Sequence, residues 1–195
     1  MTKARLIWLA LFAVCAVPVA LAISSPLLQW REPIYIAAGL AGVLTLPLLV
    51  MQPLFAARVL PDLPPRACLL AHRTVALLLL IAICVHVAGL WITSPPDVID
   101  ALLFVSPTPF SLWGVIAMWA GVVTLGLAAF WRQFGIARQN WKALHAALAV
   151  IIAAGATAHA LLIDGTMEPI SKWLICGLVL AATLTAIYRR VLRGG

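Results

Sequence analysis

The sequence predicts an all-α protein in which six helices cross a membrane as one bundle. Hydrophobic residues make up 65% of the chain and charged residues only 10%, and the mean hydropathy is +1.11. A soluble domain is less apolar and more highly charged. Six apolar runs, each long enough for a hydrocarbon core that needs about 20 residues, follow one another with short breaks. They fill nearly all of the 195 residues, so we expect a single transmembrane domain over residues 1–195.

Each apolar run predicts one span. Hydropathy and the intervening Pro, Gly and charge clusters place the spans near 6–24, 34–57, 68–92, 111–131, 143–163 and 171–191. Pro18, Pro47 and Pro53 fall inside the first two, where neighbouring helices or water can satisfy the freed carbonyls, so we expect kinks rather than breaks. The first run follows Lys3 and Arg5 and ends in Ala-Leu-Ala, as a cleaved signal peptide does. Its length favours a retained helix.

The charged residues predict the direction of each span. Eleven of the 13 basic residues fall at the two termini or in and beside the second and fourth loops, and only Arg31 and Lys172 fall in the other loops. Loops rich in Lys and Arg stay in the cytoplasm. We therefore expect a multi-pass protein of the inner (plasma) membrane with both termini cytoplasmic, in which the third and fifth spans both run outward. The eleven residues are Lys3, Arg5, Arg58, Arg66, Arg73, Arg132, Arg138, Lys142, Arg189, Arg190 and Arg193.

The composition also limits the possible functions. The six spans leave no room for a soluble domain, and the chain has no Gly-rich phosphate loop, so we expect no FAD or NADPH site. The formal charge of +7 follows from the loop topology and does not predict nucleic-acid binding. Four cysteines lie in or beside apolar runs without Cys-x-x-Cys spacing, and we interpret them as packing residues: Cys15, Cys68, Cys84 and Cys176.

All four histidines lie in two of the spans, His72 and His86 in the third, His145 and His159 in the fifth. Both pairs are fourteen residues apart. Fourteen steps of about 100° fall about 40° short of four turns, so each pair faces one side of its helix, with about 21 Å between the two rings along the axis. Because the two spans are predicted to be parallel, His72 lies level with His145 near the cytoplasm, and His86 lies level with His159 near the outer face.

This arrangement suits two stacked haems between the third and fifth spans. A six-coordinate haem needs one axial imidazole above the iron and one below, and two facing helices supply them simply. Histidines inside a membrane also form hydrogen bonds between helices or proton relays. A relay does not require equal spacing on two parallel helices, and no carboxylate accompanies these histidines. The predicted ligands of haem iron are therefore His72, His86, His145 and His159.

At these residues the chain resembles the transmembrane haem domain of the ferric reductase and NADPH oxidase superfamily, which includes the haem subunit of the periplasmic methionine sulfoxide reductase. The resemblance is carried by His72-Arg73, by His86 with the four residues after it, by the Trp-Lys-Ala-Leu-His run over 141–145, and by the His-Ala-Leu-Leu run over 159–162. It implies six helices with two b-type haems between the third and fifth. The flavin and NADPH domain of the complete oxidases is absent from this chain, so the resemblance is to a stand-alone haem subunit.

Several residues are candidates for supporting roles. Arg73, beside His72, is the predicted partner of a haem propionate, with Lys142 and Arg66 behind it. The positive-inside rule explains the same basic residues equally well. Trp91 and Trp141 stand at span ends, where interfacial tryptophans are common regardless of function.

The longest connection, over 93–109, faces outward. Its stretch from Asp97 to Val105 predicts a short helix lying in the membrane interface, as a cap of the outer haem or as an ordinary connector. Arg31 is a candidate for attracting an anionic acceptor or an outer propionate.

We therefore predict a haem-bearing oxidoreductase subunit in contact with membrane lipid, with no catalytic residue of its own. It would take electrons from a separate cytoplasmic flavin reductase or a membrane quinol. It would pass them through two haem b groups to ferric iron, oxygen or a periplasmic partner protein. Two alternatives stay open: a quinol-oxidising cytochrome b, against which ligands on the third and fifth of six spans argue, and a haem-free transporter or structural membrane protein.

Overall fold

The computed structural model describes residues 2–192, and its regular elements there are all helical. Met1 and residues 193–195, among them Arg193 of the predicted cytoplasmic set, lie outside the described residues. Seven α-helices and one short 3-10 helix follow in order: α1 Lys3–Ile23, η1 Pro26–Leu28, α2 Pro33–Ala57, α3 Pro65–Thr93, α4 Pro95–Leu102, α5 Pro109–Phe130, α6 Arg138–Leu162 and α7 Pro169–Leu192.

Six of these helices are long and apolar enough to cross a membrane, which confirms the six predicted spans. The helices α2, α3, α5, α6 and α7 begin one to five residues before the predicted spans, and α2, α3, α5 and α7 begin with proline. Proline is favoured at the first helical position because its fixed φ suits the helix and its missing N–H is not needed there. Hydropathy alone does not predict these first turns, because they precede the apolar runs. Inside the spans, α1 continues through Pro18, and α2 continues through Pro47 and Pro53, so the predicted absence of breaks is confirmed.

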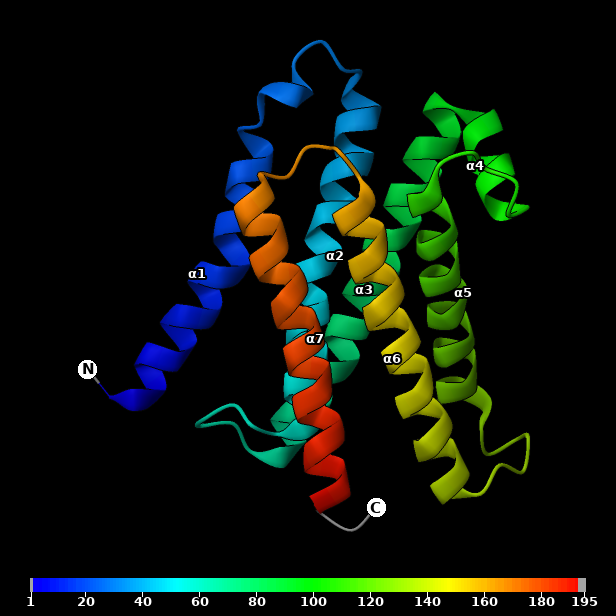
Figure 1. Cartoon of the computed structure of the whole chain (residues 1–195). Coiled ribbons are helices and arrows are strands. Elements are labelled where there is room, and N and C mark those ends of the chain that lie inside the picture. The colour runs from blue at the N-terminus through cyan, green and yellow to red at the C-terminus, as the bar shows by residue number, and fades with distance from the viewer. Residues whose placement is uncertain (1, 193–195) are drawn as a thin grey trace.

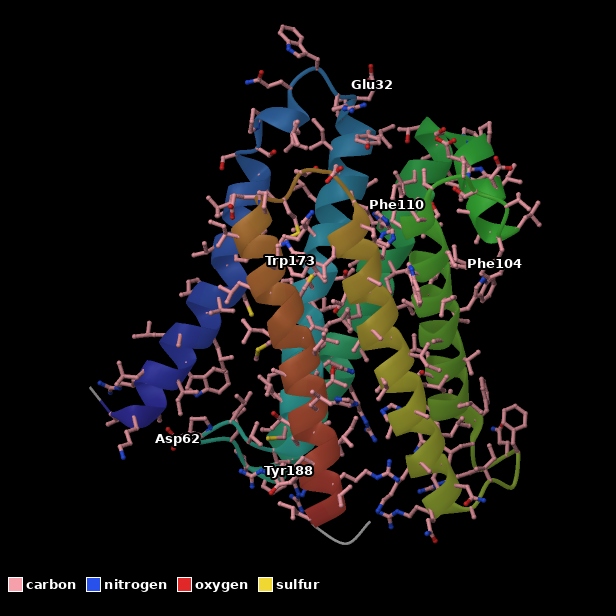
Figure 2. The ribbon with its side chains drawn as sticks, in the orientation of Figure 1. Glu32, Asp62, Phe104, Phe110, Trp173 and Tyr188 are labelled. Atoms are coloured by element: carbon pink, nitrogen blue, oxygen red, sulfur yellow. The ribbon has the colours of Figure 1, made fainter. Side chains whose placement is uncertain are left out.

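The loops gather at two ends of the bundle, as Figure 1 shows. We call one the basic end, which carries Arg58, Arg66, Arg132, Arg138 and Arg190, and the other the acidic end, which carries Glu32, Asp97, Asp100, Asp164 and Glu168. Asp62 lies at the basic end with Tyr188 (Figure 2). The helices α3 and α6 both run from the basic end to the acidic end, so they are parallel as predicted (Figure 1).

The helices pack as two close pairs, α2 with α3 and α5 with α6, and α7 joins the pairs by packing on both α2 and α6. A buried apolar cluster fills the region between α2, α6 and α7, and consists of Leu46, Val50, Ala153, Ile175, Cys176, Val179 and Ala182. All four cysteines are free thiols, and Cys68 and Cys176 are buried, as packing residues are. Among the described residues, α3 and α6 have little close backbone contact with each other.

The connection between α3 and α5 contains the predicted short helix with different bounds. The helix α4 covers Pro95–Leu102, whereas the sequence predicted helix from Asp97 to Val105. It ends early because Phe104 takes up a left-handed conformation, with φ of 61°, which an α-helix cannot include. The residues that follow α4 are exposed apolar side chains: Leu103, Phe104 and Val105. Figure 2 shows Phe104 at the edge of the acidic end, beside α5.

Candidate functional site

The four histidines face one another in two pairs. At the basic end the ring of His72 on α3 faces that of His145 on α6, with 6.2 Å between ring centroids and 66° between ring planes. At the acidic end His86 and His159 face each other at 6.3 Å and 81°. We call these the basic-end pair and the acidic-end pair. The structure therefore brings together the residues that the fourteen-residue spacing placed at common depths.

Backbone carbonyls on neighbouring helices orient three of the four rings. The Nδ1 atom of His86 lies 2.8 Å from the carbonyl oxygen of Ala38 on α2, and that of His159 lies 2.8 Å from the carbonyl of Phe110 on α5. His72 Nδ1 lies 3.1 Å from the carbonyl of Gln52 on α2. Because a carbonyl can only accept, each Nδ1 carries the proton and donates. The lone pair then stays on Nε2, the nitrogen free to bind a metal.

The fourth ring is held differently. Nδ1 of His145 is buried and has no hydrogen-bond partner among the described residues. The Trp141 ring lies 5.0 Å from the His145 ring at a tilt of 50°. The Trp131 ring stacks on Trp141, with 6.2 Å between ring centroids and 10° between ring planes. Aromatic packing therefore orients the His145 ring, whereas hydrogen bonds orient the other three rings.

The geometry fits an iron porphyrin at each level. Two imidazoles bonded at about 2 Å to opposite sides of one metal ion have ring centroids about 6.3 Å apart, and the two observed separations are 6.2 Å and 6.3 Å. Because α3 and α6 have little backbone contact, their backbones stand apart, as a porphyrin ring between them would require. Within residues 2–192, no three His, Cys, Asp or Glu side chains converge as a metal cluster. Each level thus offers two protein ligands, which is the number that haem iron takes in a bis-histidine site.

A basic hollow of about 440 Å³ opens at the basic end, and its lining includes Trp141, the residue whose ring contacts that of His145. Arg73 and Lys142, both predicted to support an anionic group, line it, and Arg66 does not. Arg132 and Arg138 add two cations that the sequence did not single out, and the stacked rings of Trp131 and Trp141 form part of its wall. The hollow therefore combines four positive charges with two aromatic faces.

The other predicted supporting residues are not part of these contacts. Trp91 is exposed near the end of α3, as an interfacial tryptophan is. The Arg31 guanidinium lies over the Tyr35 ring, 5.1 Å from its centroid. Sequence reasoning missed the carbonyls of Ala38, Gln52 and Phe110, because every residue carries such a group.

The fold and the facing histidines define a multi-pass membrane protein with a two-level imidazole site. The family described as "ferric reductase like transmembrane component" matches residues 38–162, a range that contains all four histidines. The chain belongs to this ferric reductase-like transmembrane family. No curated protein and no solved structure matches the chain.

Proposed function

We propose that this protein carries electrons across the membrane through two b-type haems, one ligated by His72 and His145 and the other by His86 and His159. One observation carries the proposal: imidazoles face each other at 6.2 Å and 6.3 Å across two parallel helices that have little other contact. The family match agrees, since it names a ferric reductase-like transmembrane component.

When bound, each haem supplies a one-electron couple between ferric and ferrous iron. The chain would supply two neutral imidazoles to each haem, which would suit the iron to one-electron transfer and not to binding oxygen or substrate. Coordination also satisfies an imidazole lone pair that would be costly in a membrane. The three Nδ1 hydrogen bonds fix ring orientation in advance, which lowers the cost of assembling the site.

The basic hollow supports an assignment for the charged groups of the haem at the basic-end pair. Haem propionates are anionic, and Arg73 and Lys142 line the hollow. Arg73 directly follows His72 in the chain. We propose that Arg73 pairs with a propionate there, because a guanidinium binds a carboxylate in bidentate fashion. Arg132 and Arg138 contribute to the same positive field.

The distribution of charge supports a direction for the pathway. By the positive-inside rule, a chain in the plasma membrane has its basic end in the cytoplasm. Electrons then enter at His72 and His145 and leave at His86 and His159. A separate flavin reductase or a membrane quinol donates them. Ferric iron, oxygen or a periplasmic partner protein accepts them.

The test is a reduced-minus-oxidised spectrum of the purified protein with a count of haems per chain. We expect low-spin b-type haem, about two per chain. Replacing His72 and His145 together, or His86 and His159 together, should each remove one haem, and Cys84→Ala, at an exposed site, should remove none. Absence of haem in the wild-type protein after expression with haem supplied contradicts the proposal. Supplying NADPH with a flavin reductase, or a reduced quinol, then identifies which donor reduces the bound haem.

A further inference from the structure

Two glycines lie directly against the rings of the acidic-end pair. A Cβ atom at Gly42 on α2 would lie 2.8 Å from Nδ1 of His86 and 2.9 Å from Cε1 of the same ring. A Cβ atom at Gly114 on α5 would lie 2.6 Å from Nδ1 of His159 and 2.8 Å from Cε1. All four distances are shorter than a Cβ atom approaches in real structures, so each ring occupies space that only a glycine leaves free.

Each glycine stands at the same position relative to the carbonyl that orients the ring. Gly42 lies four residues after Ala38, and Gly114 lies four residues after Phe110. Residues four apart share one face of an α-helix. On this face the carbonyl of Ala38 or Phe110 accepts the Nδ1 proton at 2.8 Å. The bare backbone at the glycine makes room for the ring. Phe110, labelled in Figure 2, marks this level near the acidic end.

The basic-end pair lacks this arrangement. The residue four positions after Gln52 is Ala56, and the His72 hydrogen bond to Gln52 is longer, at 3.1 Å. Nδ1 of His145 has no partner in the described residues. Other glycines of the same helices do not contact rings, since a Cβ at Gly39 on α2 or at Gly121 on α5 meets nothing within 4 Å. The close approach is therefore particular to the two positions that face the acidic-end pair.

We propose that Gly42 and Gly114 are positioning residues for the acidic-end haem site. Each lets one imidazole lie against a neighbouring helix, donate Nδ1–H to a backbone carbonyl and present Nε2 toward the opposite histidine. This inference rests on the proposed haem ligation and adds to it a role for two residues that bind nothing themselves. It makes the acidic-end site the more completely preformed of the two, since both of its histidines have an Nδ1 acceptor.

The chemistry predicts what an added methyl group does. At Gly42 the Cβ displaces the His86 ring, and the Nδ1 hydrogen bond to Ala38 weakens or breaks. An imidazole without this acceptor is a poorer electron donor to iron, and outer partners of metal-bound histidines change affinity by about 10–100-fold. Helix propensity acts in the opposite direction, because alanine is a better helix former than glycine. A harmful effect therefore reports the ring contact and not the loss of a helix.

The experiment compares Gly42→Ala and Gly114→Ala with the matched controls Gly39→Ala and Gly121→Ala on the same helices. Haem content and a redox titration are measured for each purified protein. We expect the first two variants to lose one haem or to shift one component of the titration to more positive potential, with the other component unchanged. The controls should match the wild type. If Gly42→Ala and Gly114→Ala retain two haems with wild-type potentials, the inference is wrong although the proposed function stands.

A double variant separates the ring contact from general helix packing. If Gly42→Ala is harmful because it meets the His86 ring, removing that ring relieves the conflict. Gly42→Ala combined with His86→Ala should then unfold at the same temperature as His86→Ala alone. This comparison needs no bound haem, so it tests the contact even if the single variant folds poorly or if the wild type holds no haem. Equal destabilisation by Gly42→Ala in both backgrounds overturns the inference.

Discussion

His72 and His145 face each other at 6.2 Å, but among the described residues only His72 has an acceptor for its Nδ1 proton. In the acidic-end pair, both His86 and His159 have a carbonyl acceptor for the Nδ1 proton. Hydrogen bonding at Nδ1 makes imidazole a stronger donor and stabilises ferric iron. The four cations of the basic hollow favour the more reduced, less positive state of a nearby iron. In the proposed haem sites, both effects would raise the potential at the basic end relative to the acidic end.

We therefore expect the basic-end haem to be reduced first. A redox titration of the wild type should resolve two components. The variant lacking His86 and His159 should keep the component with the more positive potential. The variant lacking His72 and His145 should keep the component with the more negative potential. The reverse assignment would contradict the argument from hydrogen bonding and charge.

Trp141 should be required for the basic-end component. Its ring lies 5.0 Å from that of His145, whose Nδ1 has no hydrogen-bond partner among the described residues. Aromatic pairs contribute about 0.5–1.5 kcal/mol beyond the area they bury. Trp141→Leu should broaden or shift the basic-end component in the spectrum and leave the acidic-end component unchanged. Trp173→Leu is the control, because Trp173 is exposed on α7 (Figure 2). An effect of equal size on both components would indicate general destabilisation.

Lys172 should stabilise the end of α6. Its side chain is only 8% exposed, and Nζ donates to the carbonyl of Ile163, which follows the last turn of α6, at 2.8 Å. A charged group bonded to a carbonyl at a helix C-terminus contributes about 1.5–3 kcal/mol. Lys172→Met should lower the thermal unfolding temperature in detergent. Lys3→Met, at an exposed position, should change stability by less than about 0.5 kcal/mol. Equal behaviour of the two variants would show that the Lys172 contact contributes nothing.

Glu168 makes the stability of α7 depend on pH. Its carboxylate accepts from the backbone N–H of Ile170 at 2.8 Å and of Ser171 at 2.7 Å. These bonds hold the pKa of Glu168 below its ordinary value of 4.5. A lowered pKa in the folded state means that the carboxylate stabilises the fold above pH 4.5, and that this contribution is lost as the pH falls through the folded pKa.

Glu168→Gln should remove this dependence. The unfolding temperature of the wild type should fall relative to that of the variant as the pH drops below 4.5, whereas the difference should be constant at neutral pH. Parallel curves through the acidic range would show that the carboxylate does not stabilise the helix.

The orientation of the bundle can be tested by a matched pair of cysteine variants. Gln29, before α2 at the acidic end, and Gln133, between α5 and α6 at the basic end, are both exposed. A maleimide that cannot cross membranes should label Gln29→Cys in intact cells, because the acidic end is predicted to face outward. Gln133→Cys should react only after the cells are opened. The opposite pattern would reverse the proposed direction of electron flow.

Hydropathy and spacing predicted the six spans and the histidine pairs, because both follow from regular repeats. Span length comes from membrane thickness, and the fourteen-residue interval places two rings on one helix face. The starts of α3 and α7 were missed because Pro65 and Pro169 begin helices without being apolar. The sequence also could not predict that His145, unlike the other three histidines, lacks a hydrogen bond at Nδ1 among the described residues. Gln52, whose carbonyl accepts from His72, stands fourteen residues after Ala38, and Thr124 stands fourteen residues after Phe110. Within residues 2–192, however, Nδ1 of His145 has no partner, at Thr124 or elsewhere. Only the positions of the helices decide which carbonyl a ring reaches.

The equal interval on α3 and α6 has a consequence for how the protein behaves in different lipids. A bundle in a thinner or thicker bilayer adjusts by tilting, but tilting does not alter the number of helical residues between His72 and His86. The distance over which an electron would have to tunnel is thus fixed by the number of helical residues between the two histidines, and bilayer thickness does not change it. We expect the internal transfer rate to stay constant in bilayers of different acyl-chain length.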